Sequence, residues 1–330
     1  MRKSVRIATP HPFAFLSCLA LLAAAPCAAQ QRGKPLVLPA RFDEHRIYVE
    51  PVTEAGRKIE FYTDTGGGLF LSQDAAKRLG LATKNLGGEG EEAFHVATLP
   101  PMRADASIPL PSSRAGRLPV YAPSPKEAAS SLMRFDGMLG QEWFAGRIWT
   151  FDYPRQRLLL RAAGDVPDVE AAHRLPLGFK TDEAGKRALD FPRVQVRVEG
   201  ATIDLLFDTG AMTELTPGAL AAVGDGGKAA RATSFITATQ FEAWRKAHPQ
   251  WRVIDDAEAG SGQAMIEVPA LEFAGHTIGP VWFTRRADQN FHEFMSQFMD
   301  RRVEGAIGGN ALRHFRITVD YPGATAYVER

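Results

Sequence analysis

The sequence predicts a mostly β protein built from two similar lobes, and three observations support this. Short alternating apolar stretches, separated by turn residues, run through most of the chain, as strands require. Residues 64–80 align with residues 208–224 without a gap. Residues 136–154 align in the same way with residues 304–322. Two repeats in the same order within 330 residues predict a duplicated domain with only a few short helices.

The composition fits a globular protein and argues against several functions. Hydrophobic residues make up 45% of the chain and charged residues 23%, with a formal net charge of +1. No dense basic cluster interleaves with aromatic residues, so we expect no nucleic-acid partner. The 8 histidines form no cluster with ligand spacing, so we expect no metal and no other cofactor. Both cysteines, Cys18 and Cys27, lie near the start, so the rest of the chain must be held by its core.

The first 29 residues have the features of an export signal peptide. Residues 1–6 are basic, residues 13–25 are apolar, and Cys27-Ala28-Ala29 offers small side chains for cleavage. An uncleaved membrane anchor is the alternative, but the run is short for a spanning helix and Pro26 interrupts it. We therefore expect cleavage near Ala29 and a periplasmic or secreted product without stable membrane insertion.

The remaining chain divides into a first lobe (30–162), a linker (163–172) and a second lobe (173–330). The linker is polar, contains proline and lacks periodicity. In each lobe an apolar strand leads directly into Asp-Thr-Gly, at residues 64–66 and again at residues 208–210. A carboxylate is thereby placed where a buried strand turns.

Each Asp-Thr-Gly is followed by a short strand and a capped helix, at about 73–79 in the first lobe and at the aligned positions of the second. The offset between the lobes grows from 144 (residue 64 to 208) to 168 (residue 136 to 304), so the second lobe carries a net insertion of 24 residues. The candidate is a helix over residues 239–248. Its Phe241 and Trp244 form an apolar face that we expect to pack on the lobe rather than bind substrate.

Two copies of one fold usually pack about a pseudo-twofold axis, where a residue near the axis meets its own counterpart. This geometry would bring Asp64 and Asp208 together. Two adjacent carboxylates cannot both ionise easily, so they share a proton. One can then act as a base on a water molecule while the other donates a proton to a carbonyl oxygen.

On these motifs, the chain resembles an aspartic protease of the pepsin and retropepsin clan. Each half carries Asp-Thr-Gly and a later apolar-apolar-Gly element, Met138-Leu139-Gly140 or Ala306-Ile307-Gly308. The resemblance covers about residues 45–330, and the simple repeat without cysteines is more similar to bacterial retropepsin-like proteins. It implies two pseudo-twofold-related acid-protease β-barrel lobes.

The resemblance further implies an exported, monomeric aspartic endopeptidase that hydrolyses a peptide or an unfolded polypeptide. A non-catalytic exported module that binds peptides in the same cleft is the alternative. The resemblance assigns roles residue by residue. The catalytic pair would be Asp64 and Asp208, the turns would be supported by Thr65, Gly66, Thr209 and Gly210, and the second motifs would hold the turns through Leu139, Gly140, Ile307 and Gly308.

The first lobe departs from the family pattern at Gly67, where Ser, Thr or Ala is frequent, and we expect the glycine-rich turn there to be flexible. The first-lobe flap would carry Phe94 and His95, and the matching second-lobe loop would be residues 260–262.

Two other patterns favour structural roles. The repeated Asp152 and Asp320, each within Asp-Tyr-Pro, are expected to form turns after a strand. Five apolar residues with helical spacing are expected to form the core face of a helix: Phe291, Phe294, Met295, Phe298 and Met299.

Overall fold

The computed structural model describes residues 34–330 apart from 89–93, 111–115 and 125–129, so the expected export signal lies outside the described residues. The described chain is mostly β with a few short helices, which confirms the predicted fold class. Within this part of the chain, no helix is long and apolar enough to cross a membrane.

The first lobe contains a mixed sheet of eight described strands, in the order β2-β3-β4-β9-β5-β8-β7-β6. At its centre β4 runs parallel to β9, which runs antiparallel to β5. The strands are β2 (Ala40–Asp43), β3 (Arg46–Val49), β4 (Phe61–Thr63), β5 (Phe70–Ser72), β6 (Thr83–Asn85), β7 (His95–Thr98), β8 (Arg117–Tyr121) and β9 (Gly137–Leu139).

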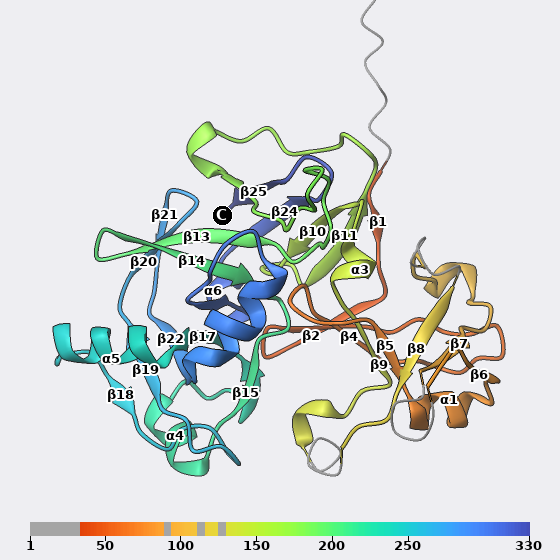
Figure 1. Cartoon of the computed structure of the whole chain (residues 1–330), viewed down its shortest axis with the longest axis horizontal. Coiled ribbons are helices and arrows are strands. Elements are labelled where there is room, and N and C mark those ends of the chain that lie inside the picture. Colours follow the sequence, from red (N-terminus) through yellow and green to blue (C-terminus); the bar gives the residue numbers. More distant parts are fainter. Residues whose placement is uncertain (1–33, 89–93, 111–115, 125–129) are drawn as a thin grey trace, which may run out of the picture. The chain divides into compact units, whose positions relative to one another are not determined.

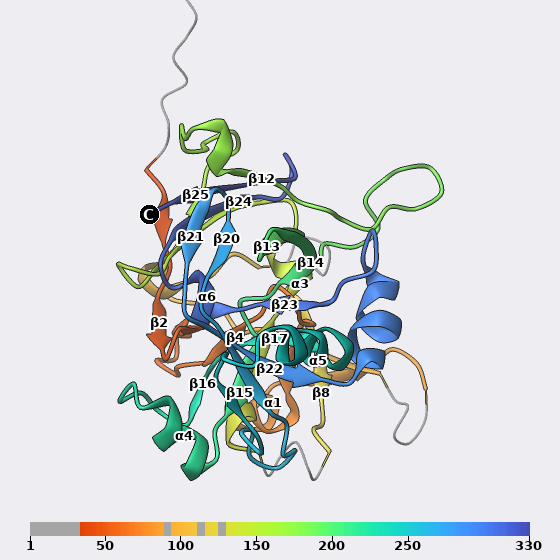
Figure 2. The ribbon, with the colours of Figure 1, turned by 90° about the vertical axis from the view of Figure 1, so that its left-hand side faces the viewer.

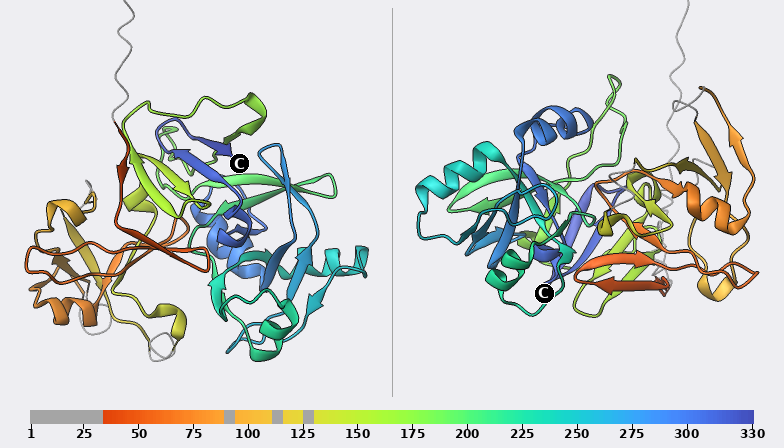
Figure 3. Two further views of the ribbon diagram at one scale, coloured as in Figure 1. Left: turned by 180° about the vertical axis from the view of Figure 1, so that it is seen from behind. Right: turned by 90° about the horizontal axis from the view of Figure 1, so that it is seen from below.

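The second lobe contains a sheet of nine described strands, in the order β21-β20-β13-β14-β23-β17-β22-β19-β18. From β13 to β18 this order and the strand directions at its centre reproduce those from β3 to β6. Figure 3 shows the strands of the first lobe, orange to yellow, on one side and those of the second lobe, green to blue, on the other. The strands are β13 (Arg193–Val198), β14 (Ala201–Phe207), β17 (Ser234–Thr237), β18 (Val253–Ile254), β19 (Met265–Val268), β20 (Leu271–Phe273), β21 (His276–Ile278), β22 (Val281–Arg286) and β23 (Gly305–Ile307).

The sheet pairing corrects the ungapped alignment beyond the Asp-Thr-Gly turns. Leu71 of β5 pairs with Gly137, and it is Ile236 of β17, not Leu215, that pairs with the equivalent Gly305. Strand β5 therefore corresponds to β17, and the helix α1 (Gln73–Leu79) that follows β5 corresponds to α5 (Ala238–Ala247). The alignment matched α1 to α4 (Pro217–Val223) because both helices have a hydroxyl N-cap and a left-handed C-terminal glycine. Caps are local signals and do not determine a strand's place in a sheet.

The insertion in the second lobe is consequently residues 212–232 and not helix α5. Thr233 N donates to Ala211 O at 3.0 Å, so the chain leaves the lobe and returns at adjacent points. The insertion also reaches the first lobe, where Lys228 Nζ lies 2.6 Å from Asp43 Oδ1. Its elements are grouped together in Figure 2: the paired strands β15 (Met212–Glu214) and β16 (Ala230–Ala232), and the helix α4 (Pro217–Val223) between them.

Helix α5 packs on its lobe, as expected. Phe241 and Trp244 are buried, and the Trp244 ring meets Phe283 edge-on at 5.4 Å. The other helices are short and follow strand ends. Besides α4, the described helical segments are α1 (Gln73–Leu79), α3 (Gln141–Phe144), α5 (Ala238–Ala247), α6 (Gly309–Leu312), η2 (Ala104–Ala106), η4 (Ser131–Met133), η5 (Ala171–His173), η6 (Asn290–Phe294) and η7 (Met295–Phe298).

A third sheet, β1-β11-β10-β24-β25-β12, combines strands from both halves of the chain (Figure 1). At its centre Thr150 of β10 lies opposite Thr318 of β24, and their Oγ1 atoms are 2.8 Å apart. These residues are each other's counterparts at the offset of 168, so the pseudo-twofold axis passes between them. The strands are β1 (Leu36–Val37), β10 (Ile148–Asp152), β11 (Arg157–Arg161), β12 (Arg174–Pro176), β24 (Arg316–Asp320) and β25 (Thr325–Glu329).

The repeated aspartates of Asp-Tyr-Pro stabilise turns, as the sequence predicts. Asp152 Oδ1 accepts a hydrogen bond from Arg155 N at 3.2 Å, and Asp320 Oδ1 accepts one from Gly323 N at 2.9 Å. Both bonds close the turn that follows the strand.

Candidate active site

Both Asp-Thr-Gly turns are held from behind by the second motif of their lobe. Asp64 N donates to Leu139 O at 3.0 Å, and Asp208 N donates to Ile307 O at 3.0 Å. The glycines of the motifs, Gly140 and Gly308, lie directly against backbone carbonyl groups, and a Cβ at either position would overlap them. Each buried strand end is therefore fixed to a second strand before the carboxylate begins.

The two turns are joined by hydrogen bonds between their threonines. Thr65 Oγ1 donates to Phe207 O at 2.6 Å and accepts from Thr209 N at 3.0 Å. Thr209 Oγ1 accepts from Thr65 N at 3.2 Å. All three bonds are buried, so the lobes have little freedom to separate at this point.

Each carboxyl group lies over the glycine of the opposite turn. A Cβ added at Gly66 would lie 2.8 Å from Cγ of Asp208, and one at Gly210 would overlap the carboxyl group of Asp64. This reciprocal arrangement brings the two carboxyl groups side by side, close enough for each to affect the pKa of the other. Bringing Asp64 and Asp208 together requires glycine on both sides.

Backbone amides orient one oxygen of each carboxyl group. Gly66 N donates to Asp64 Oδ1 at 2.8 Å, and Gly210 N donates to Asp208 Oδ1 at 2.9 Å. The symmetry of these bonds follows from the repeated tripeptide. It leaves the carboxyl groups in one defined orientation relative to each other.

The environment favours retention of a proton on the pair. Burial raises the pKa of Asp64. Burial, and then the charge of Asp64, raise the pKa of Asp208 well above its usual range. Because the two groups interact, their titration belongs to the pair. A group of this kind can act as a base and an acid at the same pH.

Gly67 is closely packed, in contrast to the flexible turn expected from the glycine run. A Cβ there would overlap Asp64 Oδ2 and lie 2.7 Å from Met138 Sδ. The Gly67 amide donates to the backbone carbonyl of Asp64 at 3.1 Å and so closes the turn. The missing side chain is therefore a consequence of close approach, and the Gly66 amide supplies the hydrogen bond to the carboxylate.

Tyr62 is a site residue that the sequence reasoning did not identify. Its hydroxyl donates to Gly210 O at 3.0 Å, so a side chain of the first lobe holds the turn of the second. Burial, and then the charge of Asp64, raise the pKa of this phenol well above its usual value. The available signal was a tyrosine within an apolar strand end, because a buried tyrosine needs a partner for its hydroxyl.

Both carboxyl groups line one cavity of about 1170 Å³. Its wall includes Gly260 and Ser261, which lie in the loop expected to match the flap. Phe94 and His95, expected in the first-lobe flap, instead line a separate cavity of about 740 Å³ that neither aspartate lines. The preceding residues 89–93 lie outside the described residues. Over the described ranges, no group of three or more His, Cys, Asp or Glu side chains is placed to hold a metal ion.

A largely buried ion pair orders the loop beside this cavity. Arg286 binds Glu258 through two bonds of 2.9 and 2.7 Å, and Glu258 also accepts from Thr213 at 2.9 Å and from Ser261 at 2.6 Å. Burial opposes ionisation of Glu258, but the bonds from Arg286 and its neighbours outweigh it and lower the pKa. No spacing in the sequence predicts this pair, because Glu258 lies in a loop and Arg286 ends strand β22, 28 residues later in the chain.

No family model and no curated protein matches the chain. Three of the solved structures that resemble it are as follows. An aspartic proteinase from Irpex lacteus has a TM-score of 0.49 at 11% identity, covering 89% of this chain and 97% of its own. Conglutin gamma, a basic 7S globulin from lupine seeds, has a TM-score of 0.46 at 12% identity, covering 90% and 95%. Basic 7S globulin from soybean has a TM-score of 0.46 at 9% identity, also covering 90% and 95%.

Proposed function

We propose that the chain is an exported aspartic endopeptidase in which Asp64 and Asp208 form the catalytic pair. The observation that carries this proposal is that the carboxyl group of each aspartate lies directly against the glycine of the opposite Asp-Thr-Gly turn. The raised pKa values of both carboxyl groups support it. The cavity above them supports access by a polypeptide.

The proposed reaction uses one shared proton. The ionised carboxylate accepts a proton from water as the water oxygen attacks the peptide carbonyl carbon, and the protonated carboxyl group donates its proton to the carbonyl oxygen. The tetrahedral intermediate then collapses. The C–N bond breaks and the leaving nitrogen takes a proton from the aspartate pair. One hydroxyl group of the intermediate gives its proton back to the pair as it becomes the carbonyl oxygen of the product. Atoms and protons balance without a covalent enzyme intermediate.

Substrate would bind in extended form in the cavity that both aspartates line. An extended peptide exposes its backbone N–H and C=O groups, which can bond to strand edges and loops of both lobes. Since each lobe supplies one aspartate, a single chain would contain a complete site and act as a monomer.

The test is cleavage of an unfolded polypeptide by the protein without residues 1–29, from acid to neutral pH. Asp64→Asn and Asp208→Asn should each reduce cleavage by roughly a thousandfold or more, because both general catalytic roles depend on the pair. Asp320→Asn is the matched control, since that aspartate stabilises a turn outside the cavity. Cleavage that survives both site substitutions would contradict the proposal.

The same assay distinguishes the endopeptidase from the alternative, a non-catalytic module that binds peptides. Wild-type protein that binds unfolded polypeptide without cleaving it at any pH would identify a peptide-binding module of this fold. Retained peptide binding by Asp208→Asn, together with lost cleavage, is the result expected of the endopeptidase.

A further inference from the structure

The helical segment η6–η7 presents two different faces. Phe291, Met295 and Met299 are buried and pack in one cluster with Leu206 of β14, the strand that leads to Asp208. Phe294 was expected on the same face but is 63% exposed, the largest exposed fraction among the described large apolar side chains that are exposed.

The wide turn of η6 explains the position of Phe294. Met295 N bonds to Phe291 O and also to Asn290 O, and the second bond, five residues back, has the spacing of a π-helical turn. Such a turn advances each residue by a smaller angle than an α-helix does, so a residue three positions after Phe291 no longer lies above it. π-Helical turns occur frequently at functional sites.

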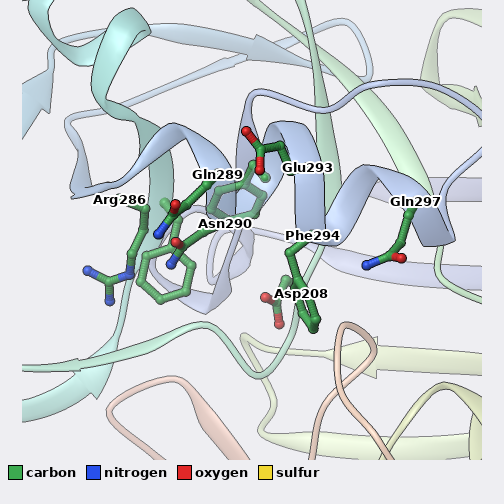
Figure 4. A pocket seen from close by; sticks show the side chains of 9 residues that line it. Asp208, Arg286, Gln289, Asn290, Glu293, Phe294 and Gln297 are labelled. Atoms are coloured by element: carbon green, nitrogen blue, oxygen red, sulfur yellow. The ribbon is translucent and has the colours of Figure 1, made fainter.

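Phe294 faces a cavity of about 680 Å³ that Asp208 also lines. Figure 4 shows Phe294, Asn290 and Gln297 extending from the helix toward the side on which Asp208 lies. Phe235 and Arg286 line both this cavity and the larger one with the two aspartates. The two cavities therefore adjoin at Asp208, and a peptide bound across the catalytic pair can place a side chain in the smaller one.

The lining favours a neutral aromatic side chain. Phe235, Phe291 and Phe294 supply ring surfaces, and Gln289, Asn290 and Gln297 supply uncharged donors and acceptors for a peptide backbone. The volume lies within the usual range for ligand pockets and accommodates a large side chain. Aromatic rings gain from edge-on or offset contacts with such a lining in addition to buried area.

The charges of the cavity argue against an acidic side chain. Arg286 is held by Glu258 and its guanidinium lies 4.1 Å from the Phe235 ring centre, so its charge is already paired. Glu293 lies at the cavity as an additional negative group.

The helical segment is anchored, so the position of Phe294 is set before any ligand binds. His292 Nε2 lies 2.7 Å from Glu304 Oε2, which also accepts from Thr237 Oγ1 at 3.0 Å. Ser296 Oγ donates to Phe291 O at 2.6 Å. Because the η6–η7 segment is already ordered, less conformational entropy is lost when a ligand binds against Phe294.

We propose that Phe294 is a specificity-determining residue that selects an aromatic substrate side chain next to the scissile bond, on the Asp208 side. The inference rests on the proposed endopeptidase function, because it identifies this cavity as a part of the substrate site. It specifies a preference that the catalytic pair alone does not imply.

The test compares two peptides that differ only in Phe or Ala at the selected position, which is first located by cleavage of a peptide mixture and mass spectrometry. Phe294→Ala should lower kcat/KM for the Phe peptide by about tenfold and for the Ala peptide by less than about twofold. Phe294→Tyr should retain the preference. Leu36→Ala, an exposed apolar residue of β1 outside the cavities, should change neither value.

Binding by the Asp208→Asn variant, measured by fluorescence with the same two peptides, separates this inference from the proposed catalysis. Cleavage with equal losses for both peptides, or with no loss, would overturn the role of Phe294 and leave the endopeptidase intact. If the wild type cleaves neither peptide, the endopeptidase function is overturned. If the Phe peptide then binds more weakly to Asp208→Asn/Phe294→Ala than to Asp208→Asn, the selective pocket is retained. Equal binding of both peptides would overturn the pocket.

Discussion

At the scale of residues, Gly67 and Gly68 are neighbours with different surroundings. A Cβ at Gly67 would overlap Asp64 Oδ2, whereas one at Gly68 meets nothing within 4 Å. We expect Gly67→Ala to displace the carboxylate and lower kcat/KM by about a hundredfold, since small misplacements of catalytic groups have effects of that order. Gly68→Ala is the matched control and should retain activity. Equal activities of the two variants, measured on one peptide, would show that the close packing at Gly67 is unimportant.

The threonines that join the turns are not equivalent despite the repeat. Thr65 Oγ1 donates to Phe207 O and accepts from Thr209 N, whereas the bond found for Thr209 Oγ1 is the one it accepts from Thr65 N. Thr65→Val leaves more buried groups unpaired, so it should lower the free energy of unfolding by about 2–3 kcal/mol, against about 1 kcal/mol for Thr209→Val. Denaturant unfolding measures both. A larger loss for Thr209→Val would be inconsistent with this asymmetry.

At the scale of elements, the sequence predicts local structure better than sheet position. The hydroxyl and glycine caps of α1 and α4 were readable, because a cap depends on the few residues around it. That α5 and not α4 is the counterpart of α1 depends on pairing of β17 with β23, which is distant in sequence. Phe294 was misplaced for a related reason: the α-helical period fails at a π turn.

Helix α5 is expected to contribute to stability and not to substrate binding. Trp244 is buried against Phe283 and Trp251 and lines neither cavity at Asp208. Trp244→Ala should lower the free energy of unfolding by about 3–5 kcal/mol and leave KM unchanged. Lys246→Ala, on the exposed side of the same helix, should be neutral in both measurements. A change of KM with Trp244→Ala would place α5 in the substrate site instead.

At the scale of the whole molecule, the repeat was sufficient to predict the meeting of Asp64 and Asp208, because an axis between equivalent lobes brings counterparts together. The paired Thr150 and Thr318 mark the same axis in the six-stranded sheet. The sequence did not predict which side chains surround the two carboxyl groups. Tyr62 bonds across the lobes to Gly210, and that contact has no sequence spacing that predicts it.

The buried pair should make stability depend on pH. The pKa of Asp208 is raised in the folded protein, by burial and then by Asp64, whereas an unfolded aspartate has a pKa of about 3.9. Between these values the folded state holds a proton that the unfolded state has lost, so this group's contribution to the free energy of unfolding decreases as pH rises. Asp208→Asn should therefore gain stability relative to wild type as pH rises above about 4. Denaturant unfolding across that range measures the difference in free energy of unfolding between Asp208→Asn and wild type. A difference that does not change with pH would contradict this prediction.

Proton sharing between Asp64 and Asp208 is tested most directly by titration of their carboxyl carbons. The protein would be labelled with ¹³C at the aspartate carboxyl groups, and the two signals would be assigned by comparison with Asp64→Asn and Asp208→Asn. We expect both groups of the wild type to titrate above the usual range of aspartate. The pKa of Asp208 should fall when Asp64 becomes asparagine, and burial should keep it raised. Independent titrations near pH 3.9, unchanged by loss of the partner, would contradict the paired-acid site.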